Sequence, residues 1–327
     1  MEELESAPWL LLGCRISEDL LDTWCHHLVT RHAPLYLTDD ALSLLPPDVP
    51  LFTREEVASN FPDLPLEARD SYQIYNVDDA ARHVVLADSP ILRALPDTDR
   101  ASLLRLQWTL GRGQIYDLAY FEELCGDELE ARMLARPFIF DTDGGPMVAL
   151  GHDVWWKLSR GKRHEWLRRF VSRDRGECVS GQVGRDLWEE IDAASGPMTR
   201  RLAGTYASKS GPNCFSTTRA SMTRDVNVAT IIADLWLHQA PFLRDLNRLG
   251  FISRGFEPDP VSVGANSILL WRDETGTYQH ACYVPYAGLA LNKDSQAWFA
   301  PRQLLPLTHI VSEWNDEGLN VIVYRVA

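Results

Sequence analysis

Three residues in the last third of the chain have the types and spacing that thiol chemistry needs. The first is Cys214, which follows a Gly-Pro-Asn turn and precedes a Phe-Ser-Thr-Thr run that is compatible with a helix. Unpaired N–H groups and the helix dipole at such a position stabilise a thiolate, so we expect a lowered pKa. The same N–H groups can bind the oxyanion of a tetrahedral intermediate. The pattern therefore predicts a nucleophile, although a lone buried cysteine can also serve packing alone.

His280 and Asn292 could supply the other two parts of such a site. We expect His280 to open a strand after a hairpin turn, and Asn292 lies in the next expected strand. A turn at Ala287-Gly288 folds the two strands back on each other, which brings imidazole and amide side by side. A neutral imidazole can take the thiol proton, and an amide oxygen can fix the imidazole tautomer. Taken singly, each could instead be an ordinary polar residue at a strand end or turn.

The order and spacing of these residues resemble the NlpC/P60 superfamily of papain-like cysteine peptidases. The resemblance covers residues 202–326 and implies a nucleophile at Cys214, a general base at His280 and an orienting residue at Asn292. It also implies that Tyr206 lines the oxyanion site. The matching stretches are Gly204–Tyr206, Gly211–Cys214, Asn266–Trp271 and His280–Lys293.

The resemblance further implies a cysteine hydrolase, an amidase or peptidase, acting through an acyl-enzyme on a peptide or on a small amide or ester. No metal or organic cofactor is expected. The chain departs from the family at Asn213, where Asp is usual, and at Phe215-Ser216, where Ser-Gly is usual. Two alternatives stay open: an acyltransferase on the same fold, and a non-catalytic binding module with a protein partner.

The pattern of the C-terminal part predicts a helix packed on an antiparallel sheet, and hence an α+β protein. A long amphipathic helix is expected at 226–249, ended by Gly250. Consecutive short strands separated by tight turns come after it. The expected strands are Ser267–Trp271, Tyr278–Pro285, Leu289–Asn292 and Asn320–Val326.

The first 195 residues read as a separate, mainly helical domain of unknown role. A small-residue break with a proline at 194–197 suggests domains of 1–195 and 196–327. The first of these holds 20 basic and 35 acidic residues, a net charge of −15, whereas the second, with 12 basic and 11 acidic residues, is close to neutral. A helix is expected at 16–29, a β-like run at 34–38 and a hairpin around residues 143–146.

Composition excludes several classes of protein. The acidic balance argues against a nucleic-acid partner, and no apolar run approaches the roughly 20 residues that span a bilayer. The acidic N-terminus is unlike a secretory signal, which predicts a cytoplasmic protein without membrane association. The six cysteines have no paired spacing, so we expect free thiols. A protein partner for the N-terminal domain remains open.

Overall fold

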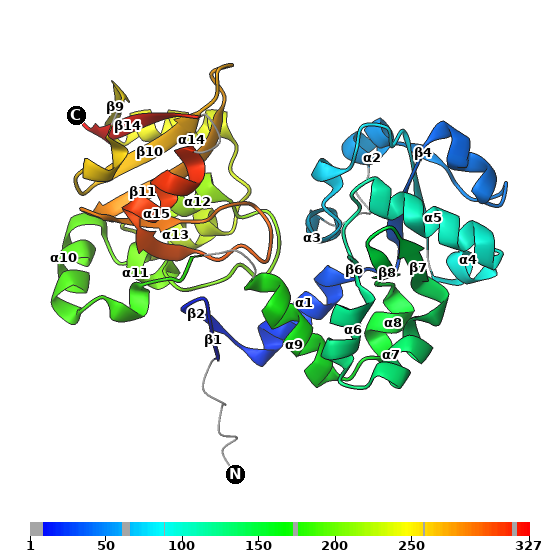
Figure 1. Ribbon diagram of the computed structural model, residues 1–327. Helices are drawn as coiled ribbons and strands as arrows, with labels where there is room; N and C mark the ends of the chain where they lie inside the picture. The colour runs from blue at the N-terminus through cyan, green and yellow to red at the C-terminus, as the bar shows by residue number, and fades with distance from the viewer. Residues whose placement is uncertain (1–8, 61–65, 88, 173–175, 258, 316–318) are drawn as a thin grey trace, which may run out of the picture. The chain divides into compact units, whose positions relative to one another are not determined.

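The computed structural model describes residues 9–60, 66–87, 89–172, 176–257, 259–315 and 319–327. Helices account for 47% and strands for 23% of the chain, and the sheets are antiparallel, which is compatible with an α+β protein. The chain divides into two compact units (Figure 1). Unit 1 comprises residues 1–20 and 171–327, and unit 2 comprises residues 21–170.

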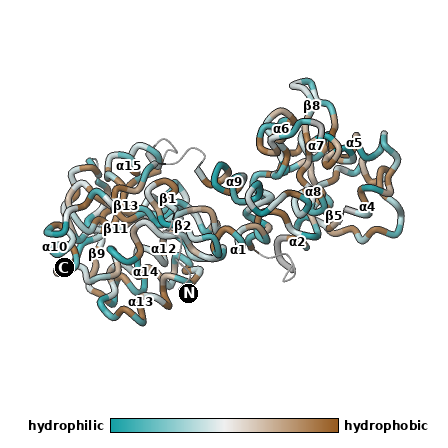
Figure 2. The backbone as a smooth tube through the Cα atoms, turned by 90° about the horizontal axis from the view of Figure 1, so that it is seen from below, coloured by the Kyte–Doolittle hydropathy of each residue, from teal (hydrophilic) through white to brown (hydrophobic). Residues whose placement is uncertain are grey.

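Unit 1 is built on a six-stranded antiparallel sheet in the order β13-β12-β11-β10-β14-β9. The four strands expected from the sequence are present, and two edge strands, β9 and β13, were not expected. Helix α15 lies on one side of the strands and helices α12 to α14 lie on the other (Figure 2). The strands are β9 (Phe251–Phe256), β10 (Ser267–Arg272), β11 (Tyr278–Tyr286), β12 (Leu289–Asn292), β13 (Gln303–Pro306) and β14 (Asn320–Val326). The helices are η4 (Ser180–Gln182), α10 (Arg185–Ser195), α11 (Met198–Leu202), α12 (Cys214–Ser221), α13 (Val226–Ala233), α14 (Gln239–Arg248), η5 (Pro260–Ser262) and α15 (Leu307–Asn315).

The two faces of this sheet bury separate apolar clusters because successive side chains of a strand point to opposite faces. Trp271, Cys282 and Val284 pack with Ile310 of α15 in one cluster. In the other, Leu270, Ala281 and Tyr283 pack with Cys214, Phe242 and Leu246 from α12 and α14. Neighbouring residues of β11 therefore belong to different faces, which decides how the candidate site is built.

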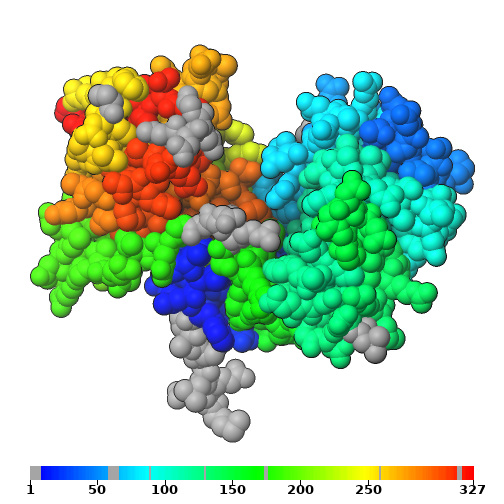
Figure 3. All heavy atoms as spheres, in the orientation of Figure 1, coloured from blue at the N-terminus to red at the C-terminus, as the bar shows by residue number. Residues whose placement is uncertain are grey.

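The division between the units differs from the boundary expected between residues 195 and 196. The N-terminal hairpin, β1 (Trp9–Leu11) with β2 (Cys14–Ile16), belongs to unit 1, and its exposed surface is blue in Figure 3. The backbone N–H of Arg15 donates to Gly204 O at 2.9 Å, and that of Val179 donates to Leu304 O at 2.9 Å. These long-range hydrogen bonds join both segments to the sheet unit, and the local composition that suggested a boundary at 195 does not reveal them.

The prediction of a single helix at 226–249 is wrong, because the structure has two helices there. Helix α13 begins after Asp225, whose carboxylate accepts from the N–H groups of Asn227 and Val228, and it ends at Ala233. Helix α14 begins only at Gln239. Pro241 explains the restart, since proline lacks the N–H of a helix interior but is tolerated in the first turn.

Unit 2 combines many helices with two three-stranded antiparallel sheets, β3-β5-β4 and β6-β8-β7. The β-like run at 34–38 corresponds to β3, and the expected hairpin corresponds to β7 and β8. None of the helices in the described ranges is long and apolar enough to cross a membrane. The strands are β3 (Ala33–Leu37), β4 (Phe52–Thr53), β5 (His83–Ala87), β6 (Ile115–Asp117), β7 (Ile139–Thr142) and β8 (Gly145–Ala149). The helices are η1 (Asp39–Leu44), α2 (Arg54–Asn60), α3 (Leu66–Ser71), η2 (Ile74–Asn76), α4 (Ser89–Ala94), α5 (Asp97–Thr109), α6 (Leu118–Cys125), α7 (Glu128–Ala135), η3 (Arg136–Phe138) and α8 (His152–Lys157), while α1 (Glu18–Leu28) and α9 (Arg160–Val171) run across the unit boundary.

Candidate active site

Cys214 is the first residue of helix α12, as the sequence predicts. Asn213 caps the helix: its Oδ1 accepts from Ser216 N at 3.1 Å, and Ser216 Oγ accepts from Asn213 N at 2.9 Å. This reciprocal capping box satisfies one of the N–H groups that a helix start leaves unpaired. Thr217 N–H donates to Asn213 O in the first helical bond. The N–H groups of Cys214 and Phe215 are left facing the sulfur.

The prediction that the pKa of Cys214 is lowered is wrong. Only 6% of the residue is exposed, and burial raises the pKa of the thiol to about 11. Hydrogen bonds from the backbone N–H groups of Ala281 and Phe215, and the charge of Lys293, lower it but do not offset burial. The helix N-terminus is therefore present as predicted, but desolvation of the sulfur outweighs it. Cys214 is a neutral thiol at pH 7.

His280 and Asn292 lie together, as expected. They come from the adjacent strands β11 and β12, and His280 Nε2 lies 2.7 Å from Asn292 Oδ1. Asn292 Nδ2 donates to Asp294 Oδ1, so the amide must present its oxygen to the imidazole. An oxygen there requires a proton on Nε2, which leaves Nδ1 as the basic nitrogen of the neutral ring. Asp294 was not singled out in the sequence, although its position two residues after Asn292 suits this contact.

The imidazole of His280 is fully buried between aromatic rings. It stacks on Trp314 of α15, with ring centroids 3.9 Å apart and an interplanar angle of 7°, and Trp271 lies 5.4 Å away. Burial lowers the pKa of His280 to about 3, against the opposing effect of the Asn292 hydrogen bond. Nδ1 has no hydrogen-bond partner among the described residues. The result is a neutral base with a free lone pair.

Cys214 contacts strand β11 at Ala281, the residue that follows His280. Its sulfur accepts from the backbone N–H of Ala281 and packs on the α12 face, whereas the His280 ring lies against α15. The same sulfur also raises the pKa of Cys282, after the larger effect of burial. No hydrogen bond joins Cys214 to His280 Nδ1 in the described part of the chain. The structure thus places the thiol at the sheet beside the histidine without joining the two.

Tyr206 and Lys293 complete the surroundings. The Tyr206 hydroxyl lies 3.5 Å from Leu11 O, which links it to the N-terminal hairpin and does not test the expected oxyanion role. Lys293 is buried, and its Nζ donates to Ser295 O at 2.7 Å and to Ala297 O at 3.0 Å. The positive charge of Lys293 lowers the pKa of Cys214. Sequence reasoning missed Lys293 because an isolated lysine after a strand reads as a surface residue.

The chain matches no protein-family model, no curated protein and no solved structure at a significant level.

Proposed function

We propose that unit 1 carries a papain-like, NlpC/P60-type cysteine hydrolase that cleaves a peptide, amide or ester through an acyl-enzyme on Cys214. The observation that carries the proposal is the oriented imidazole of His280. Its Nε2 is held by Asn292 Oδ1 at 2.7 Å, and its buried Nδ1 has no described hydrogen-bond partner. A histidine serving only to fill space would not need an amide that is itself held by Asp294.

The two neutral groups define the chemistry. Because Cys214 has a pKa of about 11 and His280 one of about 3, no preformed thiolate–imidazolium pair exists at pH 7. Proton transfer must accompany attack, as with a hydroxyl nucleophile. Cys214 packs on the α12 face of the sheet and the His280 ring packs on the α15 face, so rotation of the cysteine side chain alone does not join them. The proposal therefore requires that substrate binding move the start of α12 or the beginning of β11 until the thiol reaches His280 Nδ1.

The reaction then runs in two steps. The Cys214 sulfur bonds to the carbonyl carbon while its proton moves to His280 Nδ1, and the N–H groups of Cys214 and Phe215 receive the oxyanion. The bond to the leaving amine or alcohol breaks as Nδ1 returns the proton to it. In the second step water attacks the thioester and gives a proton to Nδ1. The C–S bond breaks, the acid is released and the proton returns to sulfur.

Acylation by p-nitrophenyl acetate tests this proposal. We expect release of p-nitrophenol and, after an acid quench, an acetyl group on the peptide that contains Cys214. Cys214→Ala should abolish both signals, and His280→Gln should reduce them at least about 100-fold, the typical contribution of a general base. His309→Gln, which changes an exposed histidine on α15, serves as the matched control. Equal acylation of the two histidine variants would refute the role of His280.

One observation favours a second candidate, the non-catalytic binding module. Cys214 is nearly buried and its pKa is raised, as expected of a cysteine that fills space. In that case no acetyl group would appear on Cys214, and acylation would be spread over surface residues. The labelling pattern therefore separates the two candidates without knowledge of the natural substrate.

A further inference from the structure

Two other buried cysteines of unit 1, Cys14 and Cys178, lie together although they are far apart in the sequence. Cys14 opens strand β2, and Cys178 lies just before η4. The backbone N–H of Cys178 donates to Leu12 O at 2.8 Å. The two thiol groups share a hydrogen bond. Neither residue belongs to the proposed hydrolase site, so a role for this pair does not rest on that proposal.

The hairpin turn is shaped to hold this pair. Leu12 and Gly13 both have positive φ, 54° and 70°, as a two-residue turn between the strands of a hairpin favours. A Cβ atom at position 13 would lie 2.3 Å from Cys178 O. Glycine is therefore required both by the turn and by the close approach of the segment that carries Cys178.

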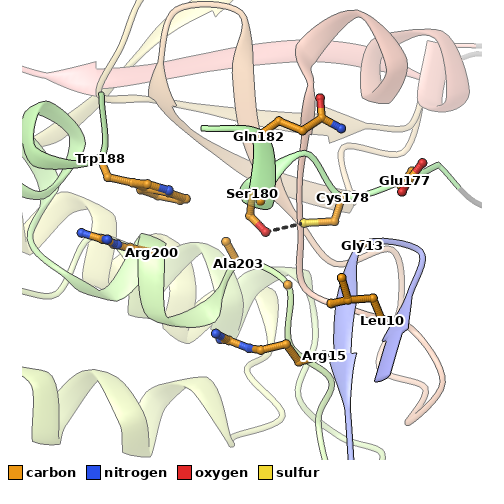
Figure 4. A pocket seen from close by; sticks show the side chains of 12 residues that line it. Leu10, Gly13, Arg15, Glu177, Cys178, Ser180, Gln182, Trp188, Arg200 and Ala203 are labelled. Carbon is orange, nitrogen blue, oxygen red and sulfur yellow. Dashed lines mark hydrogen bonds between the residues drawn. The ribbon is translucent and has the colours of Figure 1, made fainter. Parts of the chain in front are cut away.

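The surroundings of Cys178 favour a sulfur anion. Leu304 N–H donates to its Sγ at 3.3 Å, and Ser180 Oγ lies 3.2 Å from Sγ (Figure 4). The pKa of Cys178 falls to about 6, first through the hydrogen bond from Cys14 and then through those from Ser180 and Leu304, against burial. The pKa of Cys14 is raised above its usual range by the same pairing. The Leu304 N–H group and the Ser180 hydroxyl therefore favour a thiolate on Cys178 over one on Cys14.

A cavity of about 410 Å³ opens beside Cys178. Two guanidinium groups, those of Arg15 and Arg200, line it against one carboxylate, that of Glu177 (Figure 4). Arg200 also lies over the Trp188 ring at 5.7 Å and has a distant ion pair with Asp192 at 3.6 Å. The cavity has the size of a small-molecule site, and its walls carry a net positive charge.

We propose that Cys178 and Cys14 form a dithiol–disulfide exchange site for small disulfides that carry carboxylate groups. The Cys178 thiolate attacks one sulfur of the ligand, the ligand S–S bond breaks, and one ligand thiolate leaves. Cys14 then gives up its proton and attacks Cys178 Sγ, which expels the second ligand thiolate and closes the protein disulfide. One protein dithiol and one ligand disulfide thereby become one protein disulfide and two ligand thiols. The volume of the cavity and its two arginines favour such a ligand over a small hydroperoxide.

Peptide mapping under non-reducing conditions tests the proposal on the full-length reduced protein. At pH 7 with oxidised glutathione, we expect a disulfide between Cys14 and Cys178. Cys125 is the internal control, because it is 2% exposed against 3% for Cys178 and its pKa is raised to about 11. At pH 7 the fraction present as thiolate is roughly four powers of ten larger for Cys178 than for Cys125. The thiolate of the more acidic thiol is a weaker nucleophile, which lowers the ratio of the two rates by about two powers of ten. Cys178 should therefore react roughly 100-fold faster.

Two variants separate the steps and the ligand class. Cys14→Ser should stop at a mixed disulfide on Cys178 with release of one ligand thiol. Arg15→Gln should slow the reaction of oxidised glutathione severalfold but leave that of uncharged bis(2-hydroxyethyl) disulfide unchanged. The pairing is refuted if Cys178 reacts no faster than Cys125, or if the mixed disulfide forms on Cys14. Equal slowing with both reagents, or oxidation by hydrogen peroxide alone, would overturn the proposed ligand class.

Discussion

The buried imidazole of His280 should make the stability of unit 1 depend on pH. In the folded chain its pKa is about 3, and in the unfolded chain it should return to about 6.5. Below pH 6.5 the unfolded state therefore binds a proton that the folded state does not. The stabilisation is complete above pH 6.5 and is lost as the pH falls towards 3, at about 1.4 kcal/mol for each pH unit. At pH 5 the expected loss is about 2 kcal/mol.

His280→Gln isolates this contribution, because glutamine keeps a donor for Asn292 and does not titrate. Urea unfolding can be followed in each unit through a buried cysteine, Cys282 for unit 1 and Cys125 for unit 2. Labelling with 4,4′-dithiodipyridine, which reacts at acidic pH, and peptide mapping would give both transitions. Between pH 7 and pH 5 the Cys282 transition of the wild type should lose about 2 kcal/mol more than that of the variant. The Cys125 transitions should shift equally.

If the Cys282 transitions of wild type and variant shift by the same amount, within about 0.5 kcal/mol, the histidine is charged in the folded state or is open to water. Either result would contradict a buried, neutral imidazole at His280 and would remove the neutral base from the proposed mechanism.

Three further predictions concern the two sites. Asn292→Ala should destabilise unit 1 by about 1–3 kcal/mol, measured by Cys282 labelling in urea, because it leaves the buried Nε2–H of its partner unpaired; an unchanged midpoint would contradict the hydrogen bond. Gly13→Ala should destabilise unit 1, and the loss should be larger than the loss that the control Gly126→Ala causes in unit 2. Both glycines have φ near 70°, but only a Cβ at position 13 would meet a backbone oxygen. Equal losses of stability would contradict that contact. Hydroxylamine should speed deacylation of an acetylated Cys214 and yield the hydroxamate; a product that remains the free acid would argue against an acyltransferase.

The local parts of the fold could be predicted from the sequence. The strands β10, β11, β12 and β14 are apolar runs bounded by tight turns, and Cys214 begins a helix because Asn213 can cap it. Strand β9 was not predicted because it is largely exposed and contains Gly255. Strand β13 was not predicted because prolines at 301 and 306 flank its short apolar run. Edge strands of this kind lack the alternation on which sequence reasoning depends.

The long-range features could not be predicted in this way. The pairing of Cys14 with Cys178 depends on hydrogen bonds between segments that share no local signal. The pKa of Cys214 is raised, whereas a lowered pKa was expected. A sequence shows where a helix starts but not how deeply its first side chain is buried. The partners of His280 show the same limit: Asn292 was found by its spacing, whereas Trp314 comes from a helix beyond the strands.

The pH dependence of Cys214 acylation tests directly whether His280 is the general base for Cys214. If His280 Nδ1 takes the proton during attack, the rate of acetylation by p-nitrophenyl acetate should be nearly constant between pH 5 and pH 9 in the wild type. These limits lie between the pKa of the imidazole, about 3, and that of the thiol, about 11. In His280→Gln only the free thiolate can react, so the rate should rise about tenfold for each pH unit. A tenfold rise per unit in the wild type as well would show that His280 does not act on Cys214.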